Sequence, residues 1–390
     1  VIIALEAAVH AAGIRRSDAE GALIGEIGAN AVRLSHYQHP QLAYALCDEM
    51  GLLVWAEIPM LKMTESPALM DNAAQQLTEL ILQNIHHPSI FCWGIQNEIA
   101  MFRDAPFMHE NCRKLHGIVK ALDPGRYSAC ANLYPLKASS RLNEITDLVG
   151  YNIYFGWYYG ETRDYGPYLD QMHAARPALP LGISEYGVDA NLALHSENPQ
   201  VKDYSEEYQA LWHETAYPQI ESREYLWGSF IWNMFDFSSA DRDEGGQKHI
   251  NAKGLVTYDR SERKDAFFYY KAKWSSDPFL HICSKRFVLR ASERIDVKVY
   301  TNLPTATLEY SGGILEGPSD GNGTIVFPDI PLEMGKNTLR VFSGELADAC
   351  IFERVEEEET SYRLPDSGNG HVKNWFLTED DMVKEGFFSL

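Results

Sequence analysis

Two apolar segments of the sequence each end in a glutamate. Residues 91–96 are followed by Asn97 and Glu98, and residues 181–184 are followed by Glu185. Short apolar runs bounded by turn residues predict buried strands. In a (β/α)8 barrel, the residues at the C-terminal ends of such strands carry the chemistry. A pair of carboxylates at one barrel mouth is the minimum needed to cleave a glycosidic bond.

The elements that would position these glutamates alternate along the chain. Apolar runs predict seven strands and amphipathic or capped segments predict seven helices, and this alternation is typical of a parallel sheet covered by helices. The predicted strands lie at residues 30–35, 52–57, 91–98, 127–131, 148–154, 179–187 and 225–232. The predicted helices lie at residues 17–27, 40–50, 66–85, 106–122, 168–175, 206–221 and 265–274.

A barrel of this kind needs eight strands, and the first one is not recognisable in the sequence. The first helix is expected to begin at Ser17, because Ser17 to Glu20 resembles a capping box. Residues 1–10 are apolar and are expected to fill the gap as an imperfect strand or a helix, because open sheet edges leave backbone groups unpaired. We expect such a barrel to be less active than a complete one.

After Pro278 the pattern changes to short alternating runs separated by Gly, Asn and Pro turns, which predicts a small β-sandwich. The expected organisation is a TIM-barrel domain over residues 1–277, an immunoglobulin-like sandwich over residues 278–356, and a linker and tail over residues 357–390.

Composition excludes several classes of protein. The 34 basic and 55 acidic residues give a net charge of −21, and this charge repels nucleic acid and anionic membranes. The six cysteines are dispersed without a zinc signature. No apolar run approaches the roughly 20 residues that span a bilayer. We therefore expect neither nucleic acid nor membrane as a partner.

Five motifs in barrel order give the chain its resemblance to a known family, and they lie at residues 28–37, 87–89, 93–98, 184–187 and 232–237. On these motifs the chain resembles glycoside hydrolase family 2 enzymes of the β-galactosidase type, strongly over residues 17–275 and moderately over 279–355. The resemblance implies a TIM barrel followed by a sandwich. We expect no counterpart in these 390 residues of the N-terminal jelly-roll and immunoglobulin-like domains usual in the family.

The resemblance also implies roles for the two glutamates. Glu98 would be the acid/base and Glu185 the nucleophile of a retaining mechanism, about 5 Å apart. Asn97 would hydrogen-bond the sugar 2-hydroxyl. Family position further suggests substrate-binding roles for four residues. They are Arg33 and His36 near the nucleophile, Tyr154 as its hydrogen-bond donor, and Trp232 as the floor of the sugar site. Weaker candidates for the rim are His39, Glu57, Trp157, His195 and Asp236.

No metal or other cofactor is expected. Some long β-galactosidases place a Glu and a His that bind Mg²⁺ just after the third strand. Residues 57–63 contain no such pair here, and Lys62 would repel a cation.

The substrate is argued from the segment Asn251-Ala252-Lys253. It resembles an element with which β-glucuronidases bind the substrate carboxylate, so Lys253 is a further candidate. The context at residues 241–246 and 264–267 favours a β-linked galactoside or a related oligosaccharide. A β-glucuronidase, a β-mannosidase and a carbohydrate-binding remnant with little turnover remain alternatives. The remnant is suggested because residues 1–20 contain no Asn-Arg-His segment. The family resemblance is compatible with a periplasmic or secreted protein.

Overall fold

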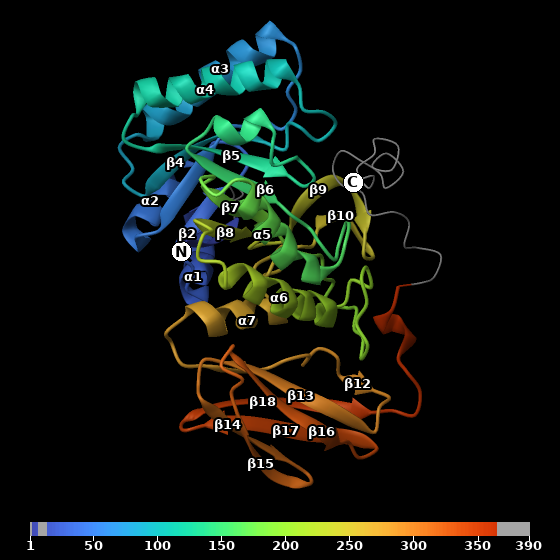
Figure 1. Ribbon diagram of the computed structural model, residues 1–390. Coiled ribbons are helices and arrows are strands. Elements are labelled where there is room, and N and C mark those ends of the chain that lie inside the picture. Colours follow the sequence, from blue (N-terminus) through green and yellow to red (C-terminus); the bar gives the residue numbers. More distant parts are fainter. Residues whose placement is uncertain (1, 7–13, 365–390) are drawn as a thin grey trace.

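A closed parallel barrel dominates the computed structural model, which describes residues 2–6 and 14–364 (Figure 1). Neighbouring strands follow one another in chain order around the barrel. The barrel strands are β1 (Ile2–Glu6), β2 (Ala31–Leu34), β3 (Leu53–Glu57), β4 (Ile90–Asn97), β5 (Tyr127–Leu133), β6 (Leu148–Asn152), β7 (Leu181–Tyr186) and β8 (Gly228–Ile231). The TIM-barrel prediction is confirmed.

The first strand, β1, closes the barrel. Ala4 lies opposite Ala31 of β2 and opposite Phe230 of β8, in parallel register on both sides. The expectation that a first strand is missing is therefore wrong, and of the two ways in which residues 1–10 were expected to fill the gap, the strand is observed. Pairing on both sides satisfies backbone groups that an open seven-stranded sheet would leave without partners. Residues 7–10 of that segment lie outside the described residues.

Helices surround the barrel (Figure 1). They are α1 (Ile14–Ile27), α2 (Gln41–Met50), α3 (Pro67–Asn84), α4 (Pro106–Leu122), α5 (Tyr165–Ala175), α6 (Glu206–Glu221) and α7 (Asp265–Trp274), with short 3-10 helices η1 (Arg141–Glu144), η2 (Thr162–Asp164) and η3 (Thr360–Tyr362). Among the described helices, none has both the length and the apolar character required to cross a bilayer.

Local sequence explains some of the helix boundaries. The Ser66 side chain accepts a hydrogen bond from the backbone of Leu69 at the start of α3, and Gly51 ends α2 with a φ of +69°. The capping box expected at Ser17 is wrong, because α1 already begins at Ile14 and Ser17 lies inside it.

Apolar side chains fill the barrel interior. The cluster combines residues of β2, β3, β4, β5 and β8, including the fully buried Trp55 and Phe230. Because the interior is packed, polar strand-end side chains can gather only at the mouth. That is where Glu98 follows β4 and where β7 carries Glu185.

Two further β-structures complete the described chain. The predicted long loop after β8 contains a hairpin, β9 (Phe237–Glu244) with β10 (Gln247–Asn251). The sandwich packs a three-stranded sheet against a five-stranded one and lies below α6 and α7 in Figure 1. Its strands are β11 (Leu280–Ile282), β12 (Leu289–Arg290), β13 (Arg294–Thr301), β14 (Thr305–Tyr310), β15 (Gly313–Pro318), β16 (Thr324–Pro331), β17 (Gly335–Ser343) and β18 (Leu346–Arg354).

Ion pairs join the sandwich to the barrel helices. Lys298 of β13 lies 2.7 Å from Glu214 of α6, and Arg286 lies 2.9 Å from Glu206 at the start of the same helix.

Candidate active site

Glu98 is held in a strained backbone conformation directly after β4. Its φ of +54° lies in the left-handed region, which residues other than glycine seldom adopt. Its backbone N–H donates to Ala131 at 2.8 Å, and Asn152 Nδ2 donates to Glu98 Oε1 at 2.9 Å. Burial, and after it the charge of Glu185, raise the pKa of Glu98 to about 8, although Asn152 and Arg33 act in the opposite direction. Glu98 is therefore protonated near neutral pH.

Glu185, in β7, is surrounded by hydrogen-bond donors. Arg33 Nη1 donates to its Oε1 at 3.0 Å, and the Tyr154 hydroxyl donates to its Oε2 at 2.6 Å. Burial, together with the charge of Glu185, raises the pKa of Tyr154 well above its ordinary value, so this hydroxyl keeps its proton and remains a donor. A cation and a neutral donor thus each contact one oxygen of the Glu185 carboxyl group.

Arg33 connects the two glutamates. It is fully buried, and its guanidinium makes a bidentate contact with Glu57, with distances of 2.8 and 2.9 Å. Its Nη2 also donates to Asn97 Oδ1 at 2.9 Å, next to Glu98 in the chain. Burial by itself would raise the pKa of Glu57, but Arg33 and His36 outweigh burial and hold that pKa below its ordinary value. Glu57, expected at the rim, thus lies at the centre of the network.

His36 and Trp232 line the site beside this network. His36 Nδ1 lies 2.8 Å from Glu57 Oε1, and its Nε2 lies 3.9 Å from Glu185 Oε1. The imidazole stacks on Trp232, with ring centroids 5.2 Å apart. His36 therefore lies near Glu185, with Trp232 stacked on it, and the substrate-binding roles of both residues stay predictions.

Lys253 reaches the same region from the segment after β10. It forms a short, buried ion pair with Asp189. Its ammonium lies 5.7 Å from the Trp157 ring centroid and 5.1 Å from that of Tyr158. Tyr158 in turn packs edge-on against Tyr154, which donates to Glu185. The Lys253 ammonium is thus linked to Glu185 through contacts with the rings of Tyr158 and Tyr154.

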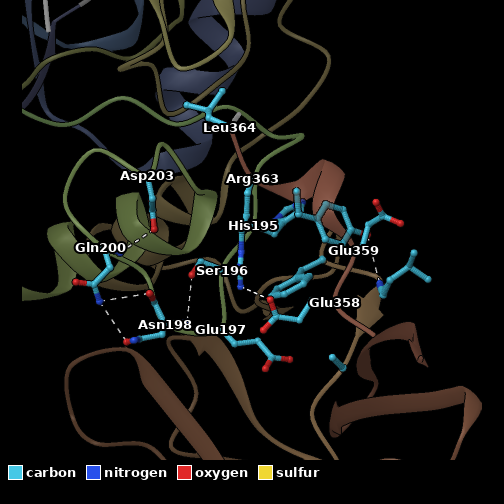
Figure 2. Close-up of a pocket in the computed structure, with 14 residues that line it drawn as sticks. His195, Ser196, Glu197, Asn198, Gln200, Asp203, Glu358, Glu359, Arg363 and Leu364 are labelled. Atoms are coloured by element: carbon cyan, nitrogen blue, oxygen red, sulfur yellow. Dashed lines mark hydrogen bonds and ion pairs between the residues drawn. The ribbon is translucent and has the colours of Figure 1, made fainter. Parts of the chain in front are cut away.

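Three of the weaker candidates make their contacts outside the network of Arg33 and the two glutamates. His39 contacts the Ser35 carbonyl at 3.0 Å, and Asp236 pairs with Lys264 at 2.9 Å. His195 pairs with Glu207 at 3.1 Å and lines a separate cavity of about 490 Å³ between residues 195–203 and the 358–364 segment (Figure 2).

Several residues of the site were not among the sequence candidates. Asn152 donates to Glu98 and to Asn97 and accepts from Ser184 at 2.6 Å. Asp189 and Tyr158 contact Lys253. Asn152 could have been found from the sequence, because it is a polar residue at the end of an apolar run. Asp189 could have been found as a carboxylate four residues after Glu185.

The described residues contain no group of three His, Cys, Asp or Glu side chains that could hold a metal ion. The carboxylate of Glu57, at the end of β3, is engaged by Arg33 and His36. Metal-independent chemistry stays a prediction.

Comparisons with known proteins agree with this geometry. Residues 14–277 match the family model described as glycosyl hydrolases family 2, TIM barrel domain. The chain is 36% identical over 336 residues to a β-glucuronidase of Bacteroides fragilis, covering 82% of this chain and 47% of that protein. It is thus similar to curated relatives of which it spans about half the length.

Solved structures give the same picture. An FMN-binding β-glucuronidase from "Facaelibacterium prausnitzii L2-6" superposes with a TM-score of 0.89 at 41% identity, over 93% of this chain and 57% of that one. Bacteroides uniformis β-glucuronidase 2, covalently bound to cyclophellitol-6-carboxylate aziridine, gives a TM-score of 0.80 at 32% identity, over 87% and 44%.

These similarities correct the expected substrate. The sequence context favoured a β-galactoside, and this preference is wrong, because the relatives at 36% and 41% identity are named β-glucuronidases. One solved structure, at 33% identity, carries the name putative β-galactosidase. The segments at residues 241–246 and 264–267 did not discriminate between the two groups. The Asn251-Ala252-Lys253 element fits the alternative that the relatives favour.

Proposed function

Because the chain belongs to glycosyl hydrolase family 2, we propose that it hydrolyses terminal β-D-glucuronides with retention of configuration. One observation carries the proposal: two neighbouring buried carboxyl groups have opposite environments. Burial raises the pKa of Glu98 to about 8, whereas Arg33 and Tyr154 donate to Glu185. Two carboxyl groups in different environments, one with a raised pKa and one facing hydrogen-bond donors, suit the acid and the nucleophile of a retaining glycosidase.

The proposed reaction has two steps. In the first, a Glu185 carboxylate oxygen bonds to the anomeric carbon while the bond to the leaving group breaks, and Glu98 gives its proton to the departing oxygen. In the second, Glu98, now ionised, takes a proton from water. The water oxygen bonds to the anomeric carbon and Glu185 leaves as a carboxylate. Atoms and charge balance over the two steps.

Asn97 and Tyr154 have positioning roles in this proposal. The Asn97 side-chain oxygen accepts from Arg33 and Asn152, which fixes the orientation of the amide. Its Nδ2 makes no hydrogen bond to the residues that the structure describes, so it is available to the sugar 2-hydroxyl. Tyr154 orients the Glu185 carboxylate.

Lys253 is proposed to bind the glucuronate carboxylate. An ammonium in a buried aromatic surrounding attracts an anion more strongly than one in water, and the named relatives are β-glucuronidases.

A panel of 4-nitrophenyl glycosides tests the proposed glucuronidase activity. We expect the glucuronide to be hydrolysed in preference to the galactoside and the mannoside. Faster hydrolysis of either neutral sugar would contradict it.

Replacement of Lys253 by alanine should lower kcat/KM for 4-nitrophenyl glucuronide by about 10²–10³-fold, because a desolvated charge pair loses one partner. The double variant Lys253→Ala/Asp189→Ala is the control, since it also removes the Asp189 charge, which the single variant leaves with Arg242, 3.6 Å away, as its remaining cation. Activity that returns in the double variant would show that charge balance, and not substrate binding, explains the loss.

The pH profile should report the protonation of Glu98. A general acid works only below its pKa, so kcat/KM should be constant between about pH 6 and 7 and fall about tenfold per pH unit well above pH 8. Initial rates on 4-nitrophenyl glucuronide across this range provide the measurement. An alkaline limb that survives in Glu98→Gln would assign the ionisation to another group.

A further inference from the structure

Another cavity is lined by residues that follow Glu98 closely in the chain. It has a volume of about 390 Å³ and lies between the segments that follow β4 and β5. We call it the β4–β5 cavity. Its lining includes Met101, Arg103, Asp104, Leu133, Lys137 and Arg141.

The β4–β5 cavity and Lys253 occupy different sectors of the barrel mouth. Lys253 contacts Trp157 and Tyr158, which follow β6, and Asp189, which follows β7. The cavity begins two residues after Glu98, with Ala100. In a retaining mechanism the acid protonates the oxygen of the leaving group, so the leaving group must lie next to the acid. The cavity is therefore in the place where the aglycone, and not the glucuronate, would be bound.

The lining combines an apolar floor with a cationic rim. Met101 and Leu133 are buried and pack together. Arg103, Lys137 and Arg141 are exposed and form no ion pair with any residue in the described part of the chain. The one carboxylate in the lining is that of Asp104, and its Oδ1 is hydrogen-bonded to His109 Nε2 at 2.5 Å.

We propose that the β4–β5 cavity binds the leaving group of the substrate and selects an aglycone that combines a ring with a negative charge, such as a carboxylate or a sulfate. The apolar floor suits the face of a ring. A protein with a net charge of −21 repels an anionic substrate, and three cations in the lining of the cavity offset that repulsion locally. This inference rests on the proposed glucuronidase activity and specifies its substrate class.

Three coumarin glucuronides that share one leaving-group oxygen test the inference. They are 4-methylumbelliferyl glucuronide, its 4-acetate analogue with a carboxylate, and its 4-methanesulfonate analogue with a sulfonate. We expect kcat/KM for the better anionic substrate to exceed that for the neutral one by about tenfold, since each partly exposed charge contact contributes modestly. A higher value for the sulfonate indicates a sulfated aglycone, and a higher value for the carboxylate indicates a uronic acid.

The triple variant Arg103→Gln/Lys137→Gln/Arg141→Gln should remove this preference and leave hydrolysis of the neutral glucuronide within about twofold. A matched control replaces three exposed cations outside the cavity, Arg113, Lys114 and Lys336, by glutamine. It changes the net charge equally and should keep the preference. Equal kcat/KM values for the three substrates in the wild type, or an unchanged preference in the triple variant, would overturn the proposal.

A binding measurement separates this inference from the proposed function. Free 7-hydroxycoumarin-4-acetate and free 4-methylumbelliferone are titrated by fluorescence into the wild type and the triple variant. Tighter binding of the anion by the wild type alone supports the cavity even if no glucuronide is hydrolysed. Equal binding of the two coumarins overturns it whatever the glycoside panel shows.

Discussion

Replacement of Glu185 by alanine should lower kcat for 4-nitrophenyl glucuronide by at least about three decades, because the covalent intermediate cannot form without the nucleophile. The Arg33 and Tyr154 donors would then face an empty position in which a small anion fits. Added azide should restore turnover. It would attack the anomeric carbon once, from the face that Glu185 occupied, and the product should be the α-glucuronosyl azide.

The matched control is Glu98→Ala. In that variant Glu185 still forms the intermediate with a good leaving group, so azide attacks from the opposite face and gives the β-azide, with retained configuration. Proton NMR of the anomeric signal distinguishes the two products. If the α-azide came from Glu98→Ala and the β-azide from Glu185→Ala, the two roles would have to be exchanged. Thermal melting of each variant establishes that the loss is not a folding defect.

Replacement of Arg33 by methionine should lower the free energy of unfolding by about 3–5 kcal/mol, the usual consequence of removing one partner from a buried ion pair. Arg33 is fully buried and contacts Glu57, Asn97 and Glu185, so the variant leaves two buried carboxylates without their cation. Urea denaturation at pH 7 is the measurement. The exposed Arg113, changed to methionine in the same way, should alter stability by no more than about 0.5 kcal/mol.

The pH dependence of this loss has a definite sign. The pKa of Glu57 in the folded protein lies below its ordinary value of 4.5. Its interaction with Arg33 therefore stabilises the folded state above pH 4.5 and is lost as the pH falls through the lower folded-state pKa. The difference between wild type and Arg33→Met should shrink on acidification over that range. A difference that stays constant from pH 7 down to pH 3 would mean that Glu57 is not the partner responsible.

The barrel and its two strand-end glutamates were predictable because they depend on local sequence. An apolar run that stops at a carboxylate predicts a buried strand with a charged tip wherever the strand lies. The helices α4, α6 and α7 begin and end at the predicted residues. Apolar periodicity, Pro106 at the start of α4 and the Ser205 cap of α6 are local features of the sequence.

Tertiary structure decided what depends on residues far apart in the chain. Ile2–Glu6 becomes a strand because closure brings β2 and β8 to its two sides, and its own short sequence carries no distinctive signal. Glu57 lies at the centre of the Arg33 network, and His195 lies in a separate cavity. The sequence does not reveal this, because the folded structure determines which side chains are close enough to form hydrogen bonds. The sequence supplied the two carboxyl groups, and the fold made them different: burial raises the pKa of Glu98, while Arg33 and Tyr154, distant in the chain, converge on Glu185.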